Sequence, residues 1–149
     1  MKIRPAVPSD IPALLRFRLD LWPDETDQWH RQDMEEFFDG KGRSTLGAIL
    51  IAEDADGTPA GFVDLSIRPY AEGCYTGRVA YLEGWYVIPG LRRKGVGAAL
   101  VAAAEAWGRT QGCTEFGSDA LADNTLSEMA HKALGFTEVE TIRCFRKDL

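Results

Sequence analysis

Apolar and polar residues recur along the chain with periods that predict both helices and strands. Apolar positions at helical spacing cover 11–22 and 27–38, and an alanine-rich helix is predicted over 95–111. A further helix is expected from Asp123 or Asn124 to Leu134, where either side chain can cap its amino end. Strand-like runs cover 2–6, 46–53, 59–68, 78–88, 114–118 and 138–147. This order predicts an α+β fold, a mixed sheet flanked by helices.

Two local patterns refine the expected sheet. Residues 54–57, Asp-Ala-Asp-Gly, suit a hairpin turn, so the runs on either side should pair antiparallel. In the run 78–88, period two predicts that five side chains share one face: Val79, Tyr81, Glu83, Trp85 and Val87.

Length and composition predict one folded unit, a single domain over 1–149. Hydrophobic residues make up 45% of the 149 positions and charged residues 27%, which is ordinary for a globular protein. No apolar run approaches the roughly 20 residues needed to cross a bilayer. The first ten residues carry charges and prolines where a secretory signal needs an apolar core, so we expect a cytoplasmic protein.

The charge pattern bears on the kind of partner. The net charge of -6 would repel the phosphate backbone of a nucleic acid. The basic residues also form only one short cluster, Arg92–Lys94, so nucleic acid is not an expected partner. An acidic surface favours a cationic ligand, although the same charge also serves solubility alone. No membrane partner is expected.

The cysteines and histidines do not form a metal-binding pattern. Three cysteines stand far apart without a Cys-x-x-Cys pair, and the two histidines have no second ligand at metal-binding spacing. We therefore expect no metal, and buried, reduced thiols at Cys74, Cys113 and Cys144.

A strand, a glycine-rich loop and a helix follow one another over 82–97, and this order predicts an anion site at the helix amino end. The P-loop needs Lys and then Ser or Thr after its second glycine, but Val96 and Gly97 stand there. The dinucleotide fingerprint needs a third glycine where Leu100 stands. What remains is the pattern Arg92-x-x-Gly95-x-Gly97.

This pattern resembles the signature of the GNAT (general control non-repressible 5-related) N-acetyltransferase superfamily, which holds the pyrophosphate of coenzyme A. A second block, Ala130–Phe136, resembles the closing helix of that family. The resemblance implies the GNAT fold, a mostly antiparallel sheet splayed at the cofactor strand, and acetyl-CoA as co-substrate. The cofactor-binding residues it implies are Trp85, Tyr86, Val87, Arg92, Arg93, Lys94, Gly95, Val96, Gly97 and Asn124.

Three residues are candidates for catalysis. Glu83 is the only charged side chain between Val79 and Ile88, so it is our candidate general base; the alternative is a structural pair with an arginine such as Arg78. By resemblance, the backbone N–H of Val87 would polarise the acetyl carbonyl. His131 stands where most of the family has a proton-donating tyrosine, and either that role or a structural one is open. Asn124, likewise, would hold the pantetheine arm or water, or cap a helix.

The sequence also contains short patterns that resemble aminoglycoside 6'-N-acetyltransferases, which confer resistance and often dimerise. They are Leu21-Trp22-Pro23, Asp64-x-Ser66-Ile67-Arg68, Gly73-Cys74, Leu82-Glu83-Gly84, Ser118-Asp119 and Asn124-Thr125. The resemblance implies a homodimer and an aminoglycoside site at Trp22, Tyr70, Glu83, Asp119 and Glu140.

Other functions stay open at this point. The same loop would serve a GNAT enzyme acting on polyamines or protein N-terminal amines, or a non-catalytic module that binds acetyl-CoA. Within the implied site, Trp22 could instead be a core residue and Asp119 could cap a turn.

Overall fold

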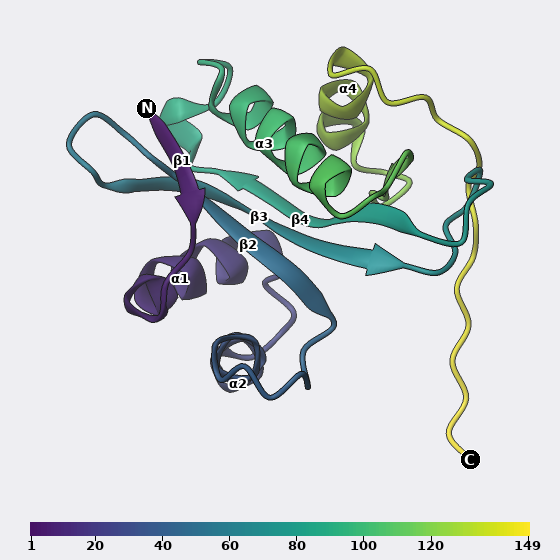
Figure 1. The fold of residues 1–149 in the computed structure, drawn as a ribbon, viewed down its shortest axis with the longest axis horizontal. Helices are drawn as coiled ribbons and strands as arrows, with labels where there is room; N and C mark the ends of the chain where they lie inside the picture. The colour runs from purple at the N-terminus through teal and green to yellow at the C-terminus, as the bar shows by residue number, and fades with distance from the viewer.

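The computed structural model describes residues 1–149, and its centre is one mixed sheet with the strand order β1-β2-β3-β4-β5 (Figure 1). The first four strands pair antiparallel, and β5 lies parallel to β4. The predicted hairpin between β2 and β3 is confirmed, with Gly57 at a positive φ of 79°. The strands are β1 (Lys2–Pro5), β2 (Leu46–Glu53), β3 (Pro59–Arg68), β4 (Val79–Val87) and β5 (Phe116–Ser118).

The helices cover both faces of this sheet. On one face α1 (Ile11–Leu21) and α2 (Asp27–Phe38) pack through Leu14, Phe17 and Met34 against Phe62 of β3. On the other face lie α3 (Val96–Thr110) and α4 (Thr125–Ala133) (Figure 1). Two single 3-10 turns, η1 (Pro8–Asp10) and η2 (Pro89–Leu91), precede α1 and α3. The sequence therefore predicted every helix within a few residues.

Side chains cap α2 and α4 but not α1, and the cap of α4 is the one predicted. The side chain of Asn124 accepts a hydrogen bond from Ser127 N at 3.0 Å at the start of α4, and Thr26 caps α2 in the same way. At α1 no side chain caps the helix, and the Asp10 carboxylate accepts from Val7 N and from Arg4 instead. That carboxylate ties the turn before α1 to the first strand.

The prediction that the side chains of alternate residues from Val79 to Val87 share one face of β4 is wrong. Asp64 pairs with Gly84 and Leu65 with Leu82, so Glu83 is an extra residue in a β-bulge. A bulge shifts the two-residue period by one position. Leu82 and Trp85 consequently both face α3, whereas Tyr81, two residues before Glu83, faces the opposite side.

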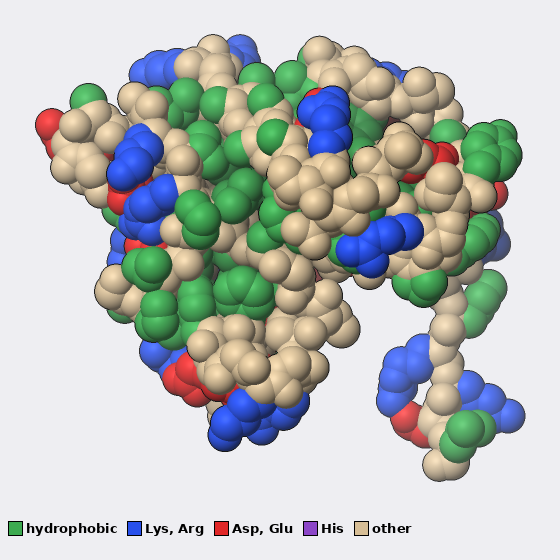
Figure 2. Space-filling model, viewed as in Figure 1, with side chains coloured by type: hydrophobic (Ala, Val, Ile, Leu, Met, Phe, Trp, Pro, Cys, Tyr) green, Lys and Arg blue, Asp and Glu red, His purple; other side chains and the backbone are tan.

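The predicted last strand, 138–147, is not part of the sheet, and this prediction is wrong for the isolated chain. Residues 137–149 are exposed and form no helix or strand, and the chain end stands apart from the body (Figures 1 and 2). We call this segment the C-terminal arm. Its side chains Val139, Ile142 and Phe145 are 58%, 53% and 92% exposed. Alternation alone cannot make a strand without a neighbouring edge to pair with.

The three cysteines are free thiols, but only Cys113 is buried. Cys74 is half-buried and Cys144 is exposed on the C-terminal arm, so the expectation of burial fails for both. Among the helices, none has the length and apolar character required to span a membrane.

Candidate active site

The sheet opens where β4 separates from β5. The two strands pair only at Ala80, Tyr81 and Leu82, so β4 has no partner on this side from Glu83 onward. Ile88 N donates to Ala60 O of β3, and successive strand residues point their N–H groups in opposite directions. The N–H of Val87 therefore faces the opening, as does its carbonyl, which accepts from Arg92 Nε at 2.8 Å.

The glycine-rich loop ends in an exposed helix amino terminus. Gly95 occupies the cap position of α3 with φ 86° and offers no side-chain cap, while Arg93 has φ 59°. The first N–H to bond within the helix is that of Ala99, to Gly95 O. The N–H groups of residues 96–98 are thus free to hold an anion, where the helix dipole also favours negative charge. Lys94 is exposed beside them.

Trp85 forms the wall between α3 and α4. A Cβ built on Gly97 would lie 3.0 Å from its indole ring, so any other residue at this helix position would push the indole by a few tenths of an ångström. The indole Nε1 is buried and has no hydrogen-bond partner. A buried N–H without a partner carries an energetic cost that a polar ligand atom would remove. The free amides, the glycine contact and this orphan donor all fit an elongated diphosphate ligand such as coenzyme A.

His131 lies across the opening from Trp85, with ring centroids 5.4 Å apart. Its Nδ1 is 2.7 Å from Ser127 O and its Nε2 is 2.8 Å from Ser118 Oγ. Because Nδ1 faces a carbonyl, the neutral ring carries its proton there, and Nε2 then accepts from Ser118. Donation from Nε2 requires the protonated ring.

Three of the implied cofactor residues, Tyr86, Asn124 and Val96, are placed differently from the rest. Tyr86 turns its side chain to the α1 face, where its hydroxyl donates to Asp20 Oδ2 at 2.7 Å and its ring packs on Phe17. Only the backbone of Tyr86 can therefore reach the opening. Asn124 is engaged as the cap of α4, and Val96 is buried in the core, so it contributes its N–H alone.

Glu83 sits on the bulge with its carboxylate fully engaged on one side. Its Oε1 accepts from Ser66 Oγ at 2.5 Å and from Arg68 Nε at 2.8 Å, and its Oε2 accepts from Arg68 Nη2 at 2.7 Å. The arginine partner considered from the sequence, Arg78, instead donates to Gln111 O. The Glu83 side chain remains 26% exposed, so it is open to a ligand.

A cleft of about 560 Å³ opens beside Glu83 on the α1 and α2 face. Trp22 forms one wall, stacked on His30 at 6.0 Å. Beneath it the buried Arg18 donates to Asp33 and Asp64 at 2.6 and 2.8 Å. The residues that line this cleft include Arg18, Trp22, Glu25, Trp29, Asp33, Asp64, Ser66, Arg68 and Glu83.

Burial raises the pKa of Asp64 to about 6, because desolvation outweighs the attraction of Arg18. This buried pair of Arg18 and Asp64 was not predicted from the sequence. A signal was present, since Arg18 occupies a helical position among apolar residues, and an arginine buried there needs a carboxylate partner.

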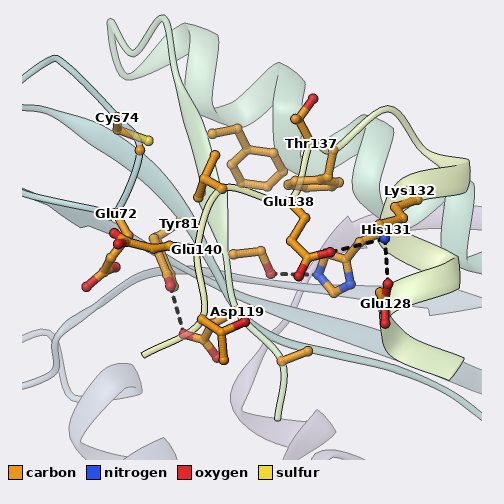
Figure 3. Close-up of a pocket in the computed structure, with 18 of the residues that line it drawn as sticks. Glu72, Cys74, Tyr81, Asp119, Glu128, His131, Lys132, Thr137, Glu138 and Glu140 are labelled. Atoms are coloured by element: carbon orange, nitrogen blue, oxygen red, sulfur yellow. Dashed lines mark hydrogen bonds and ion pairs between the residues drawn. The ribbon is translucent and has the colours of Figure 1, made fainter. Parts of the chain in front are cut away.

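A second cavity, of about 540 Å³, lies between β5, α4 and the C-terminal arm (Figure 3). Asp119 accepts from Tyr81 Oη at 2.7 Å, and Glu140 of the arm lies at this same end. Burial and the Asp119 carboxylate raise the pKa of Tyr81, which therefore stays a neutral donor. Lys132 is the only lysine in the lining, against seven carboxylates: Glu72, Glu105, Glu115, Asp119, Glu128, Glu138 and Glu140. Such a lining attracts cations.

The structure thus brings Trp22 and Glu83 together in one cavity, and Asp119 and Glu140 in the other. Tyr70 lines neither cavity and is 66% exposed.

Comparisons with known proteins agree with this architecture. The model of the acetyltransferase (GNAT) family matches residues 14–136. An aminoglycoside N(6')-acetyltransferase type 1 of Klebsiella aerogenes is 54% identical over 147 residues, which cover 99% of this chain and 96% of that protein. The structure of AAC(6')-IG from Acinetobacter haemolyticus superposes with a TM-score of 0.90 at 36% identity, covering 100% and 99% of the two chains. The structure of AAC(6')-Iy in complex with the bisubstrate analogue CoA-S-monomethyl-acetylneamine superposes with a TM-score of 0.89 at 39% identity, covering 99% of this chain and 98% of that one.

Proposed function

The chain belongs to the acetyltransferase (GNAT) family, and we infer that it transfers the acetyl group of acetyl-CoA to the 6'-amino group of aminoglycosides, which confers resistance to them. The predictions of family, fold and enzyme class are confirmed by the family match and by the similar AAC(6') structures. The geometric observation that carries the activity is the juxtaposition of Glu83, at the acidic cleft, with the open edge of β4.

Acetyl-CoA, when bound, supplies an acetyl group activated as a thioester. We propose that Arg92, Arg93 and the free amides of residues 96–98 hold its diphosphate at the amino end of α3. The orphan Nε1 of Trp85 donates to a polar atom of the same ligand. Glycine at 97 leaves the indole in place, because a side chain there would press on its ring.

In the reaction the substrate amine attacks the acetyl carbonyl carbon directly, so a C–N bond forms as the C–S bond breaks. The Val87 N–H at the open edge donates to the carbonyl oxygen, which gains negative charge. Glu83 accepts the proton of the amine, directly or through water. His131, in its protonated form, is the candidate that returns a proton to the sulfur from Nε2. In this structure Nε2 is hydrogen-bonded to Ser118 Oγ.

The aminoglycoside, a polyhydroxyl cation, suits the charge of both cavities. We propose that Glu83 and the wall of Trp22 take the reacting sugar, while Asp119 and Glu140 bind further ammonium groups through charge-assisted hydrogen bonds. Tyr70 would have to move inward to join them, since it is exposed outside both cavities in this structure.

The test is acetyl transfer to a panel of amines. Purified protein is mixed with acetyl-CoA and kanamycin, tobramycin, spermidine or a peptide with a free amino terminus, and thiol release is followed while NMR locates the acetyl group. Acetylation of the 6'-amino group of the drugs is the expected result. Preferential turnover of spermidine or peptide would move the function to the polyamine or N-terminal class. Binding without thiol release would favour the non-catalytic module.

We also propose that the protein is a homodimer in which the C-terminal arm of one copy pairs with the sheet edge of the other. The arm exposes Val139, Ile142 and Phe145, and β5 offers a free edge. The end of the C-terminal arm carries Arg143, Arg146 and Lys147, whereas the whole protein has a net charge of -6. The basic end of the arm and the acidic body of a second copy are therefore electrostatically complementary.

Light scattering tests the dimer. We expect twice the chain mass for the full chain and one chain mass after deletion of residues 143–149. A full chain that stays monomeric at micromolar concentration would contradict the proposed dimer.

For the location we propose the cytoplasm, where thiols such as the three free cysteines stay reduced. We also propose that residues 1–149 form one catalytic domain.

A further inference from the structure

The pattern Asp64-x-Ser66-Ile67-Arg68 has no role in the reaction described so far, although it lies beside Glu83. Asp64, Ser66 and Arg68 are alternate residues of β3, so their side chains project from the same face of the strand. Asp64 bonds Arg18, whereas Ser66 and Arg68 both bond Glu83. The pattern therefore supports the candidate base from the neighbouring strand.

The hydrogen bonds of Glu83 leave it one free acceptor position. A carboxylate has four lone-pair sites, two on each oxygen. Ser66 Oγ and Arg68 Nε occupy both sites on Oε1, and Arg68 Nη2 occupies one site on Oε2. The remaining lone pair on Oε2 is the place where a substrate amine or a water can bond.

Arg68 is itself held from a second direction. Its guanidinium carbon lies 3.6 Å from the centroid of the Tyr81 ring, in a cation–π contact. The hydroxyl of Tyr81 donates to Asp119. Because Tyr81 is buried, this contact fixes the plane of the guanidinium and connects Glu83 in one cavity to Asp119 in the other.

We propose that Arg68 is a positioning residue for the transfer reaction: together with Ser66 it holds Glu83 in one orientation, with a single Oε2 lone pair directed to the amine. This inference rests on the proposed function. The planar fork of an arginine suits the task because it binds both carboxylate oxygens and stacks on an aromatic ring at once, which a lysine cannot do.

A double-mutant cycle tests this proposal. In the wild-type background Arg68→Met should lower kcat by about tenfold to a hundredfold, part of what a positioned base contributes, and change the KM for acetyl-CoA less than about twofold. In a Glu83→Gln background the same substitution should change kcat by less than about twofold, because Arg68 acts through Glu83. Arg68→Lys should recover part of the lost rate. Arg78→Met, which removes an arginine bonded only to Gln111 O, is the matched control and should retain the wild-type rate.

The opposite results are equally distinct. An equal fall of kcat in both backgrounds would assign Arg68 a general structural role and overturn the proposal, as would a rise in kcat. A spectroscopic reading serves where Glu83→Gln leaves no measurable turnover. The side-chain carboxyl carbon resonance of Glu83 should move in Arg68→Met and not in Arg78→Met, and an unmoved resonance would also overturn it. Absence of turnover in the wild type would count against the proposed function alone, since this signal is read without substrate.

Discussion

Replacing Asp64 by asparagine should change how the stability of the protein depends on pH. Asp64 is 2% exposed, pairs with Arg18 at 2.8 Å and has one carboxylate oxygen without a partner. Burial raises its pKa from 3.8 to about 6. Asparagine keeps the size of the side chain but cannot titrate, so the difference between the two proteins isolates this one group.

The sign and size follow from the linkage between proton binding and folding. A folded-state pKa above the unfolded value means that the native state binds the proton more tightly between pH 3.8 and 6. The favourable contribution is therefore fully present below pH 3.8 and is lost as pH rises through about 6. The difference between a pKa of 3.8 and one of about 6, at about 1.36 kcal/mol per pH unit, gives about 3 kcal/mol as an upper limit.

Urea unfolding between pH 4 and pH 8 provides the measurement. The free energy of unfolding of the wild type, minus that of Asp64→Asn, should fall by up to about 3 kcal/mol from pH 4 to pH 7 and then stay level. Asp10→Asn is the control. The hydrogen bonds from Arg4 hold the pKa of Asp10 below its usual value of 3.8, so its contribution is lost only as pH falls below about 3.8, and the difference between the wild type and Asp10→Asn should stay nearly level from pH 4 to pH 8. A wild-type advantage over Asp64→Asn that grows with pH would mean that the attraction of Arg18 outweighs burial, and would refute the reasoning.

Three glycine substitutions probe the site through close contacts. A Cβ at Gly84 would lie 2.6 Å from the Trp22 ring, so Gly84→Ala should raise the aminoglycoside KM and leave cofactor affinity unchanged in calorimetry. Gly97→Ala should do the reverse, weakening acetyl-CoA binding by displacing Trp85. Gly61→Ala would place a Cβ 2.5 Å from the backbone oxygen of Tyr86 and should destabilise the fold by about 3 kcal/mol in denaturant unfolding, because backbone cannot move aside cheaply. An unchanged aminoglycoside KM would contradict the expectation for Gly84→Ala, and an unchanged acetyl-CoA affinity that for Gly97→Ala. An unchanged unfolding midpoint would contradict the expectation for Gly61→Ala.

Local patterns in the sequence determined most of the elements, because periodicity and caps act over short distances. The boundaries of α2, β2 and β3 agree with the expected ranges at every end, and Asn124 caps α4 as one of its two interpretations required. The anion loop could likewise be recognised from Arg92, Gly95 and Gly97, since the spacing of glycines and the following helix are consecutive in the chain.

Contacts between distant residues were decided only by the tertiary structure. The bulge at Glu83 arises from the register of β4 against β3, and it reverses the faces that alternation predicts. The partner of Glu83 is Arg68 rather than Arg78 for the same reason, because strand pairing brings residues 66 and 68 beside the bulge.

The chain by itself thus specified which residues could form helices, strands and an anion loop, since those properties depend on neighbours in sequence. It could not specify that Arg18 and Asp64 pair under Trp22, or that Arg68 connects Glu83 to Tyr81 and Asp119. Those contacts depend on how β3, β4 and α1 pack. The C-terminal arm shows the same limit: its alternating side chains have strand character, but a strand forms only where another edge is present to pair with it.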